Sequence, residues 1–279
     1  MPTIDLATKF SPLVDERFYA ESKSALVTNK DYDFVGAHTI KIYSVGTAEM
    51  NNYGRNTNGT SRYGTVKDLE TDIQEVSMEK DRSFTFAVDK MDEDETLGAL
   101  NAGSALARQL REVITPEVDA YAYGKMATGA GTAVTETITS SNAYTALVAG
   151  TEVLDENSVN VEGRVAIVTP AFYANLKKDN NAVLETEIGQ DMRIRGVVAN
   201  MDGITIQKVP SSFLPEGTNF ILAHPVATTL AIKLAEYKVH NNPQGVSGAL
   251  VEGRVYYTAF VRNNKKKAIY VSASQTVSL

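Results

Sequence analysis

The sequence predicts an α+β fold organised around one long helix, and three observations point to this class. Residues 92–127 carry apolar side chains at steps of three and four, the period of an amphipathic helix. Residues 36–48 and 72–89 alternate apolar and polar side chains, as half-buried strands do. Residues 131–235 alternate short strand and helix patterns, which indicates a compact mixed region.

The composition excludes several classes of function. The chain has 279 residues, of which 43% are hydrophobic, so it can bury a sizeable core. It has no cysteine, which excludes disulfides and thiol chemistry, and its three histidines are too widely spaced for a histidine metal cluster. The net charge of −7 provides no basic field for nucleic acid. We expect no membrane span and no signal peptide, because no apolar run approaches the required length.

The first 35 residues are predicted to form an arm. Ser11 and Pro12 stand where the N-cap and the first residue of a short amphipathic helix belong. This helix packs either on its own domain or on a neighbouring subunit. Its apolar residues at helical spacing include Phe10, Leu13, Val14 and Phe18.

Residues 36–90 are predicted to form an extended β-hairpin. Its tip, residues 51–65, contains three glycines, four asparagines and no aliphatic residue. An isolated hairpin is barely stable in water, and loops longer than about 12–15 residues are uncommon unless they are functional. We therefore expect this hairpin to lie against a partner surface, on its own chain or on another subunit.

Residues 92–127 are predicted to form the long helix. Asp92 is a suitable N-cap, and Glu95 completes a capping box. Pro116 is expected to bend the helix, because proline lacks an amide hydrogen and crowds the preceding turn. The helix serves either as a strut for other segments or as a buried helix of a large enzyme. Its apolar stripe comprises Leu97, Leu100, Gly103, Leu106, Leu110, Val113, Ile114, Val118 and Tyr121, and the residues expected to lie away from it are Arg108, Arg111, Glu112 and Asp119.

The remaining residues are predicted to form short strands and helices. Asn142 and Pro170 are expected to begin two of the helices. The lysine-rich segment 263–267 fits a solvated hairpin turn better than a nucleic-acid contact. Strands are predicted at 132–139, 164–169, 204–209, 220–223, 237–239, 253–261 and 268–271, and helices at 142–156, 170–179 and 226–236.

The sequence contains no catalytic motif. It lacks the Walker A, GxGxxG and GxSxG patterns. The acids at 92–95 are explained by the start of a helix, where negative charge is favourable. We therefore predict no catalytic, cofactor-binding or metal-binding residue.

The order of these parts resembles the major capsid proteins of tailed bacteriophages. The resemblance is carried by FSPLVDERFYAES in the arm, HTIKIYSVGTAEMNNYGRN at the entry to the loop, and VITPEVDAYAYGKMA at the end of the long helix. It implies the tailed-phage major capsid fold, which is shared with encapsulin shell proteins. The implied parts are an N-terminal arm at 1–35, an extended loop at 36–90, the spine helix of a peripheral domain at 91–130, an axial domain at 131–235, and terminal strands at 236–279 that return to the peripheral domain.

The resemblance implies function by assembly. Pentamers and hexamers would form an icosahedral shell around double-stranded DNA, without sequence-specific binding, in the cytoplasm of a host bacterium. It also implies separate scaffolding and portal proteins, no cofactor and no membrane. Two alternatives remain, an encapsulin-like compartment that encloses cargo enzymes and a monomeric α+β enzyme. The predicted subunit-interface residues are Phe10, Leu13, Val14, Phe18, Tyr53, Arg55, Arg62 and Tyr63.

Overall fold

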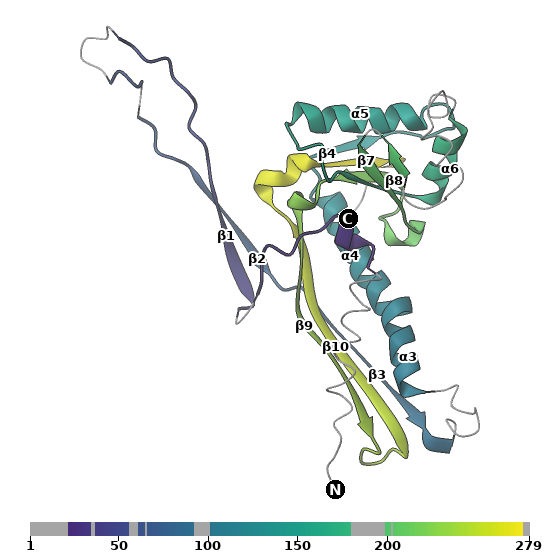
Figure 1. Ribbon diagram of the computed structural model, residues 1–279. Helices are drawn as coiled ribbons and strands as arrows, with labels where there is room; N and C mark the ends of the chain where they lie inside the picture. Colours follow the sequence, from purple (N-terminus) through teal and green to yellow (C-terminus); the bar gives the residue numbers. More distant parts are fainter. Residues whose placement is uncertain are drawn as a thin grey trace.

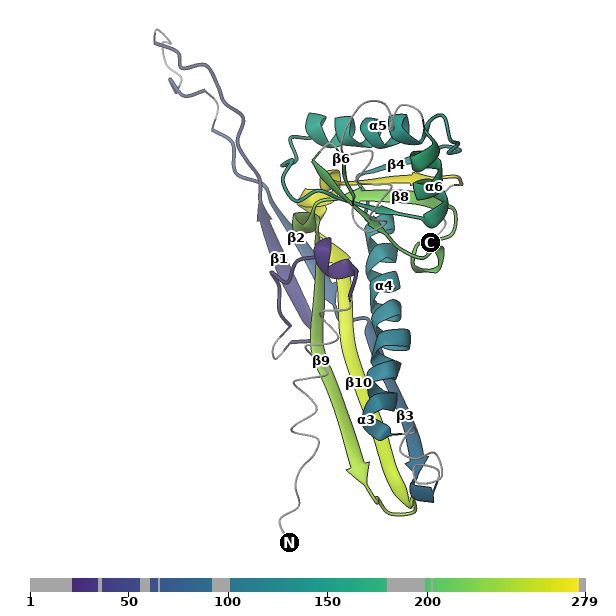
Figure 2. The same cartoon turned by 45° about the vertical axis from the view of Figure 1, so that its right-hand side comes forward.

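The computed structural model describes residues 22–34, 37–55, 61–64, 66–91, 101–179, 199–201 and 203–275. Figures 1 and 2 show three parts: a mixed body of helices and strands, a long helix that runs beside three strands, and a narrow hairpin that projects to one side. Helices and strands both contribute to the fold, so the predicted α+β class is confirmed.

The mixed body is a six-stranded sheet with the strand order β4-β11-β8-β5-β7-β6. β4 is parallel to β11 and β5 is parallel to β7, whereas the other pairs are antiparallel. The strands are β4 (Thr132–Thr135), β5 (Val165–Val168), β6 (Ala199–Met201), β7 (Ile204–Lys208), β8 (Thr218–Ala223) and β11 (Ile269–Ala273).

The two faces of this sheet are covered by different helices. Helices α5 (Ala143–Glu156) and α6 (Pro170–Lys178) pack on one face, around Phe172 and Phe220. The other face packs on Tyr123 and Met126 from the end of the long helix. The long helix is therefore joined to the mixed body by a continuous apolar core.

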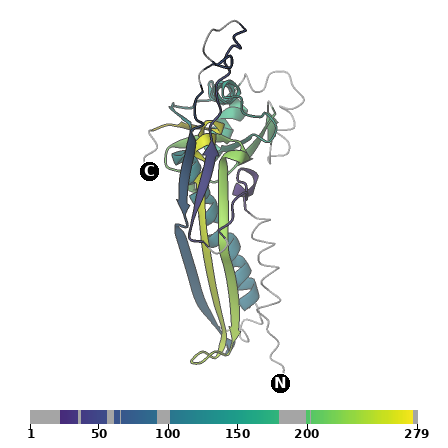
Figure 3. The ribbon, with the colours of Figure 1, turned by 90° about the vertical axis from the view of Figure 1, so that its left-hand side faces the viewer.

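The second sheet has three antiparallel strands in the order β3-β10-β9. They are β3 (Lys80–Asp89), β9 (Thr228–Asn241) and β10 (Gly248–Val261). Figure 3 shows these strands running together along the molecule. Alternate residues of the central strand, such as Val251, Val255 and Tyr257, are buried against the long helix.

The long helix has three segments: α3 (Ala102–Gln109), the π-helical turn η2 (Leu110–Ile114) and α4 (Thr115–Thr128). Asn101 has an extended backbone and its side chain accepts a hydrogen bond from the Gly103 amide, as an N-cap does. This helix therefore begins at Ala102, and the prediction of one helix running from residue 92 is wrong. Asp92 and Glu95 lie outside the described residues.

The helix changes its hydrogen bonding immediately before Pro116. The Thr115 amide bonds to the carbonyl of Leu110, five residues earlier, which defines the π-helical turn. Proline supplies no amide hydrogen to the helix, and a wider turn relieves the crowding of its ring. The hydrogen bonding thus changes at the predicted position, and the helix nevertheless continues to Thr128. The bend at Pro116 stays a prediction.

Two predictions about the faces of this helix are wrong. Val113 is 46% exposed, because Ile114 takes the core-facing place about 100° further round the helix. Asp119 is buried, because residues 22–24 pack against the side of the helix on which it lies. Leu106, Leu110 and Val118 are buried as predicted.

The predicted hairpin is shorter than expected. β1 (Thr39–Val45) pairs with β2 (Thr71–Ser77), but the chain then changes sheets and β3 pairs with β10 instead. The expected return strand at 72–89 is thus two strands with different partners. The residues between them are Met78 and Glu79.

The helix predicted at 226–236 is wrong. Apart from the short turn η4, this segment belongs to strand β9, which pairs along its length with β10. Its leucine, alanine, lysine and glutamate residues favour a helix locally, but pairing with a buried central strand overrides that preference.

Short 3₁₀ turns connect several of the described elements. They are η1 (Ser24–Leu26), η3 (Ser211–Phe213), η4 (Pro225–Ala227) and η5 (Asn263–Ala268).

The terminal strands divide between the two sheets. β10 lies in the three-stranded sheet, whereas β11 lies in the six-stranded sheet between β4 and β8. The expectation that the terminal strands all return to the part that contains the long helix is therefore wrong for β11. The lysine-rich segment is exposed, as predicted, but η5 joins two sheets and is not a hairpin turn.

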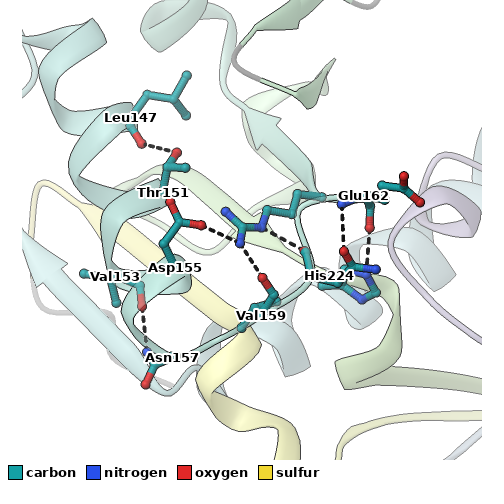
Figure 4. A network of polar contacts seen from close by, with 10 residues as sticks. Leu147, Thr151, Val153, Asp155, Asn157, Val159, Glu162 and His224 are labelled. Atoms are coloured by element: carbon teal, nitrogen blue, oxygen red, sulfur yellow. Dashed lines mark hydrogen bonds and ion pairs between the residues drawn. The ribbon is translucent and has the colours of Figure 1, made fainter.

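Buried polar groups tie the end of α5 to the start of β5. The Arg164 side chain is 1% exposed, donates to Asp155 and to the carbonyls of Val159 and Asn160, and closes the loop between these elements. Figure 4 shows this network beside His224, whose ring nitrogen contacts the Glu162 carbonyl.

Asn142 precedes α5, as predicted, but it does not cap the helix, because its side chain bonds to Thr139.

Candidate assembly surfaces

The two faces of the β1–β2 hairpin differ in their surroundings. Ile42 of β1 and Val76 of β2 lie on the same face of the hairpin. Both are buried in a cluster that includes Met78 and Phe260. On the other face, Tyr43 lies directly opposite Ile73, and these side chains are 67% and 51% exposed. Both faces of the hairpin therefore carry apolar side chains, but only one face is covered by its own chain.

More apolar side chains are exposed beyond the paired strands. The Gly46 amide bonds to the Glu70 carbonyl just beyond the strands, and Met50, four residues after Gly46, is fully exposed. Apolar groups gathered on one projecting element are typical of a surface that binds another protein. We call the following residues the exposed apolar set: Tyr43, Val45, Met50, Val66, Leu69 and Ile73.

Four predicted interface residues meet near the tip of the hairpin. The rings of Tyr53 and Tyr63 pack edge to face with their centroids 5.1 Å apart. The Gly54 amide bonds to the Arg62 carbonyl, which closes the chain beside them. Arg55 and Arg62 are exposed there, so the tip combines aromatic surface with positive charge. The other predicted interface residues, Phe10, Leu13, Val14 and Phe18, lie outside the described residues.

The sequence patterns did not identify the exposed apolar set. They predicted strand alternation around residues 36–48, which places Tyr43 on the opposite face from Ile42. The sequence did offer one indication, because both of these positions are apolar. A hairpin with one buried face and one face in water normally carries polar residues on the face in water.

Part of the predicted arm, residues 22–24, is fixed to the long helix. The buried carboxylate of Asp119 accepts hydrogen bonds from the backbone amides of Lys23 and Ser24 and from the hydroxyls of Ser22 and Ser24. Burial raises the pKa of the neighbouring Tyr123 phenol, and the charge of Asp119 raises it further. Residues 22–24 therefore pack on the long helix of their own chain.

In the part of the chain that the structure describes, no group of three or more histidine or acidic residues could hold a metal ion, and no helix could span a membrane. A groove of about 440 Å³ lies on the three-stranded sheet, but it is open and polar. Its charges have partners within the chain, since Lys238 pairs with Glu236 at 2.8 Å and Arg254 with Asp81 at 2.6 Å.

The sequence profile described as phage capsid protein matches residues 72–272. This chain belongs to the phage capsid protein family. The matched range begins in β2 and ends in β11, so it includes the three-stranded sheet, the whole long helix and nearly all of the six-stranded sheet.

Solved structures share the fold of this capsid protein. A chain from Mycobacterium phage Che8 is 16% identical, with a TM-score of 0.72 and 90% of each chain covered. A chain from the capsid of cyanophage P-SCSP1u is 14% identical, with a TM-score of 0.69, and 89% of this chain and 86% of that chain are covered. A virus-like particle from Pyrococcus furiosus is 10% identical, with a TM-score of 0.61, and 96% and 100% are covered. No curated protein sequence matches the chain.

Proposed function

We propose that this phage capsid protein is the major, non-enzymatic shell subunit of a tailed phage. Its copies form pentamers and hexamers, and these close into an icosahedral shell around double-stranded DNA. The family match supports the capsid role. The observation that carries assembly is the exposed apolar set on a hairpin that projects from the rest of the subunit.

Burial of this set between subunits supplies a driving force for assembly. A large apolar side chain gains about 1.5–3 kcal/mol when it is fully buried. The set contains six such residues, five of which are already partly covered, so we expect a gross gain of several kcal/mol per subunit before the cost of association. The same contact would recur at every subunit, which gives a shell its cooperative stability.

The proposed partner of the hairpin is a second copy of this chain. Tyr53, Arg55, Arg62 and Tyr63 would extend the contact at the tip, where aromatic and arginine side chains are favoured interface residues. Phe10, Leu13, Val14 and Phe18 of the arm are proposed to contact a further neighbour. The division into arm, extended loop, peripheral domain and axial domain also remains part of this proposal.

The charge of the chain suits a container for DNA. A net charge of −7 repels the phosphate backbone, so the shell would enclose DNA without gripping a sequence. Separate scaffolding and portal proteins and assembly in the host cytoplasm complete the proposal.

A compartment that encloses cargo enzymes is the second candidate. The observation that favours it is the similarity to the Pyrococcus furiosus particle over 96% of this chain. Genes for terminase, portal and tail proteins beside this gene would favour the phage capsid, whereas a neighbouring gene for a cargo enzyme would favour the compartment.

The direct test is to express the chain alone and together with the products of its neighbouring genes, and to examine the lysates by electron microscopy and sedimentation velocity. The proposal predicts closed megadalton shells of uniform diameter. A protein that stays monomeric under both conditions and at high concentration would contradict it.

A further inference from the structure

The geometry points to Glu79 as a positioning residue, which fixes the direction in which the β1–β2 hairpin leaves the subunit. This inference rests on the proposed function, because the hairpin matters as the element that carries the exposed apolar set to a neighbour. Its chemistry, however, lies wholly within one subunit.

Glu79 lies where the chain passes from one sheet to another. β2 ends at Ser77 in the hairpin, and β3 begins at Lys80 in the three-stranded sheet. Figure 1 shows the hairpin diverging from the three-stranded sheet in this region. A junction of two residues, Met78 and Glu79, would act as a hinge if nothing held it from the side.

Helix α4 holds this junction through two side chains one turn apart. The Tyr121 hydroxyl donates to Glu79 Oε2 at 2.7 Å. The Lys125 ammonium lies 2.7 Å from the same oxygen and 3.0 Å from Oε1, so both carboxylate oxygens have partners. Residues four apart lie on one face of a helix. Tyr121 and Lys125 can therefore both bind the Glu79 carboxylate from the same side of α4.

The Tyr121 ring is itself held in place. It packs edge to face on Tyr257 of the central strand β10, with the ring centroids 5.5 Å apart. The ammonium groups of Lys80 and Lys125 each lie 5.5 Å from the Tyr121 ring centroid, within range of a cation–π interaction. The contact to Glu79 therefore connects the junction to the core between the long helix and the three-stranded sheet.

A second, separate contact also restricts the direction of the hairpin. Gln74 in β2 donates to the Val261 carbonyl at 2.9 Å and accepts from the Asn263 amide at 3.0 Å. The buried cluster of Ile42, Val76 and Phe260 already attaches the hairpin to β10, and the polar contacts of Gln74 and Glu79 limit how far the hairpin can rotate about that cluster. Gln74 therefore holds β2 to the end of β10 and the start of η5, whereas Glu79 holds the junction after β2 to α4.

The contact at Glu79 is better suited to positioning than to holding the fold together. The side chains of Glu79 and Lys125 are 46% and 33% exposed, and ion pairs so open to water add little to global stability. Met78, beside Glu79, already anchors the chain: it is buried, and its amide bonds to the His38 carbonyl. Loss of the Glu79 contact should therefore free the angle of the hairpin without unfolding the subunit.

The test measures that angle in the unassembled subunit. Because the chain has no cysteine, Asp68→Cys on the hairpin and Glu152→Cys on α5 provide two unique sites for spin labels. Double electron–electron resonance then gives the distribution of distances between the hairpin and the mixed body. The test variants are Glu79→Gln and Lys125→Met, and the matched control is Glu75→Gln, an exposed glutamate of β2.

We expect one narrow distribution for the unmodified subunit and for Glu75→Gln, and a broader or shifted distribution for both test variants. Their melting temperatures should stay close to that of the unmodified subunit. Unchanged distributions in Glu79→Gln and Lys125→Met would overturn the inference, and so would a large loss of thermal stability in both. Because the distances are measured on single subunits, the result is independent of shell formation, whose failure would count against the proposed function alone.

Discussion

The strongest single prediction concerns Asp119, a buried carboxylate without a cationic partner among its hydrogen-bond donors. Replacing it by alanine removes four hydrogen bonds and leaves the amides of Lys23 and Ser24 without their acceptor. Each buried amide left unpaired costs about 1–3 kcal/mol. Allowing for relaxation and non-additivity, we expect Asp119→Ala to lower the free energy of unfolding by about 3 kcal/mol.

This loss can be measured by thermal unfolding of the isolated subunit, followed by circular dichroism. At about 2–4 °C per kcal/mol for chains somewhat shorter than this one, the melting temperature should fall by roughly 6–12 °C. Limited proteolysis should also cut faster near residues 22–24. The matched control is Glu112→Ala on the same helix, whose exposed pair with Arg108 should contribute below about 1 kcal/mol. An Asp119→Ala subunit as stable as this control would refute the reasoning.

Further predictions concern Glu79 and two glycines. Partial burial raises the pKa of Glu79, but hydrogen bonds from Lys125 and Tyr121 outweigh this effect and hold the pKa below the ordinary value of 4.5. The modest stabilisation that Glu79 provides is therefore present above pH 4.5 and lost as the pH falls through the lowered pKa. Lys125→Met should raise the pKa of Glu79 in an NMR titration. An unchanged pKa would disprove the ion pair. Gly253→Ala should cost about 1–3 kcal/mol in denaturant unfolding, because the new Cβ would overlap the Phe84 ring and crowd the Tyr237 ring. Gly124→Ala, with no heavy atom within 4 Å of the added carbon, should instead stabilise helix α4 by up to about 1 kcal/mol, and equal effects at both glycines would contradict the packing described here.

Local patterns predicted most elements of the mixed body. Strand β5 and helix α6 were found because Pro170 and the apolar run before it mark their boundary, and Thr169 caps the helix beside that proline. The long helix was recognised from its apolar period and from a proline that alters its bonding without ending it. These features depend on residues close together in the sequence.

Long-range pairing decided the features that the patterns missed. β9 is a strand because β10 pairs with it, although its own composition favours a helix. Asp119 is buried because a segment 95 residues earlier supplies its donors. The exposed apolar set was missed for the same reason, since periodicity shows which residues share a face but not whether the chain covers that face.

The measurement that tests the central claim most directly compares the assembly of two surface variants, one of the hairpin and one of the mixed body. One carries Tyr43→Ser, Val45→Thr and Ile73→Thr on the open face of the hairpin. The other carries Val148→Thr and Val161→Thr, exposed apolar residues of the mixed body. Sedimentation velocity, with circular dichroism as the check on folding, should show shells for the control and folded, unassembled subunits for the hairpin variant. Shells of normal yield and heat resistance from the hairpin variant would contradict the claim that this surface drives assembly.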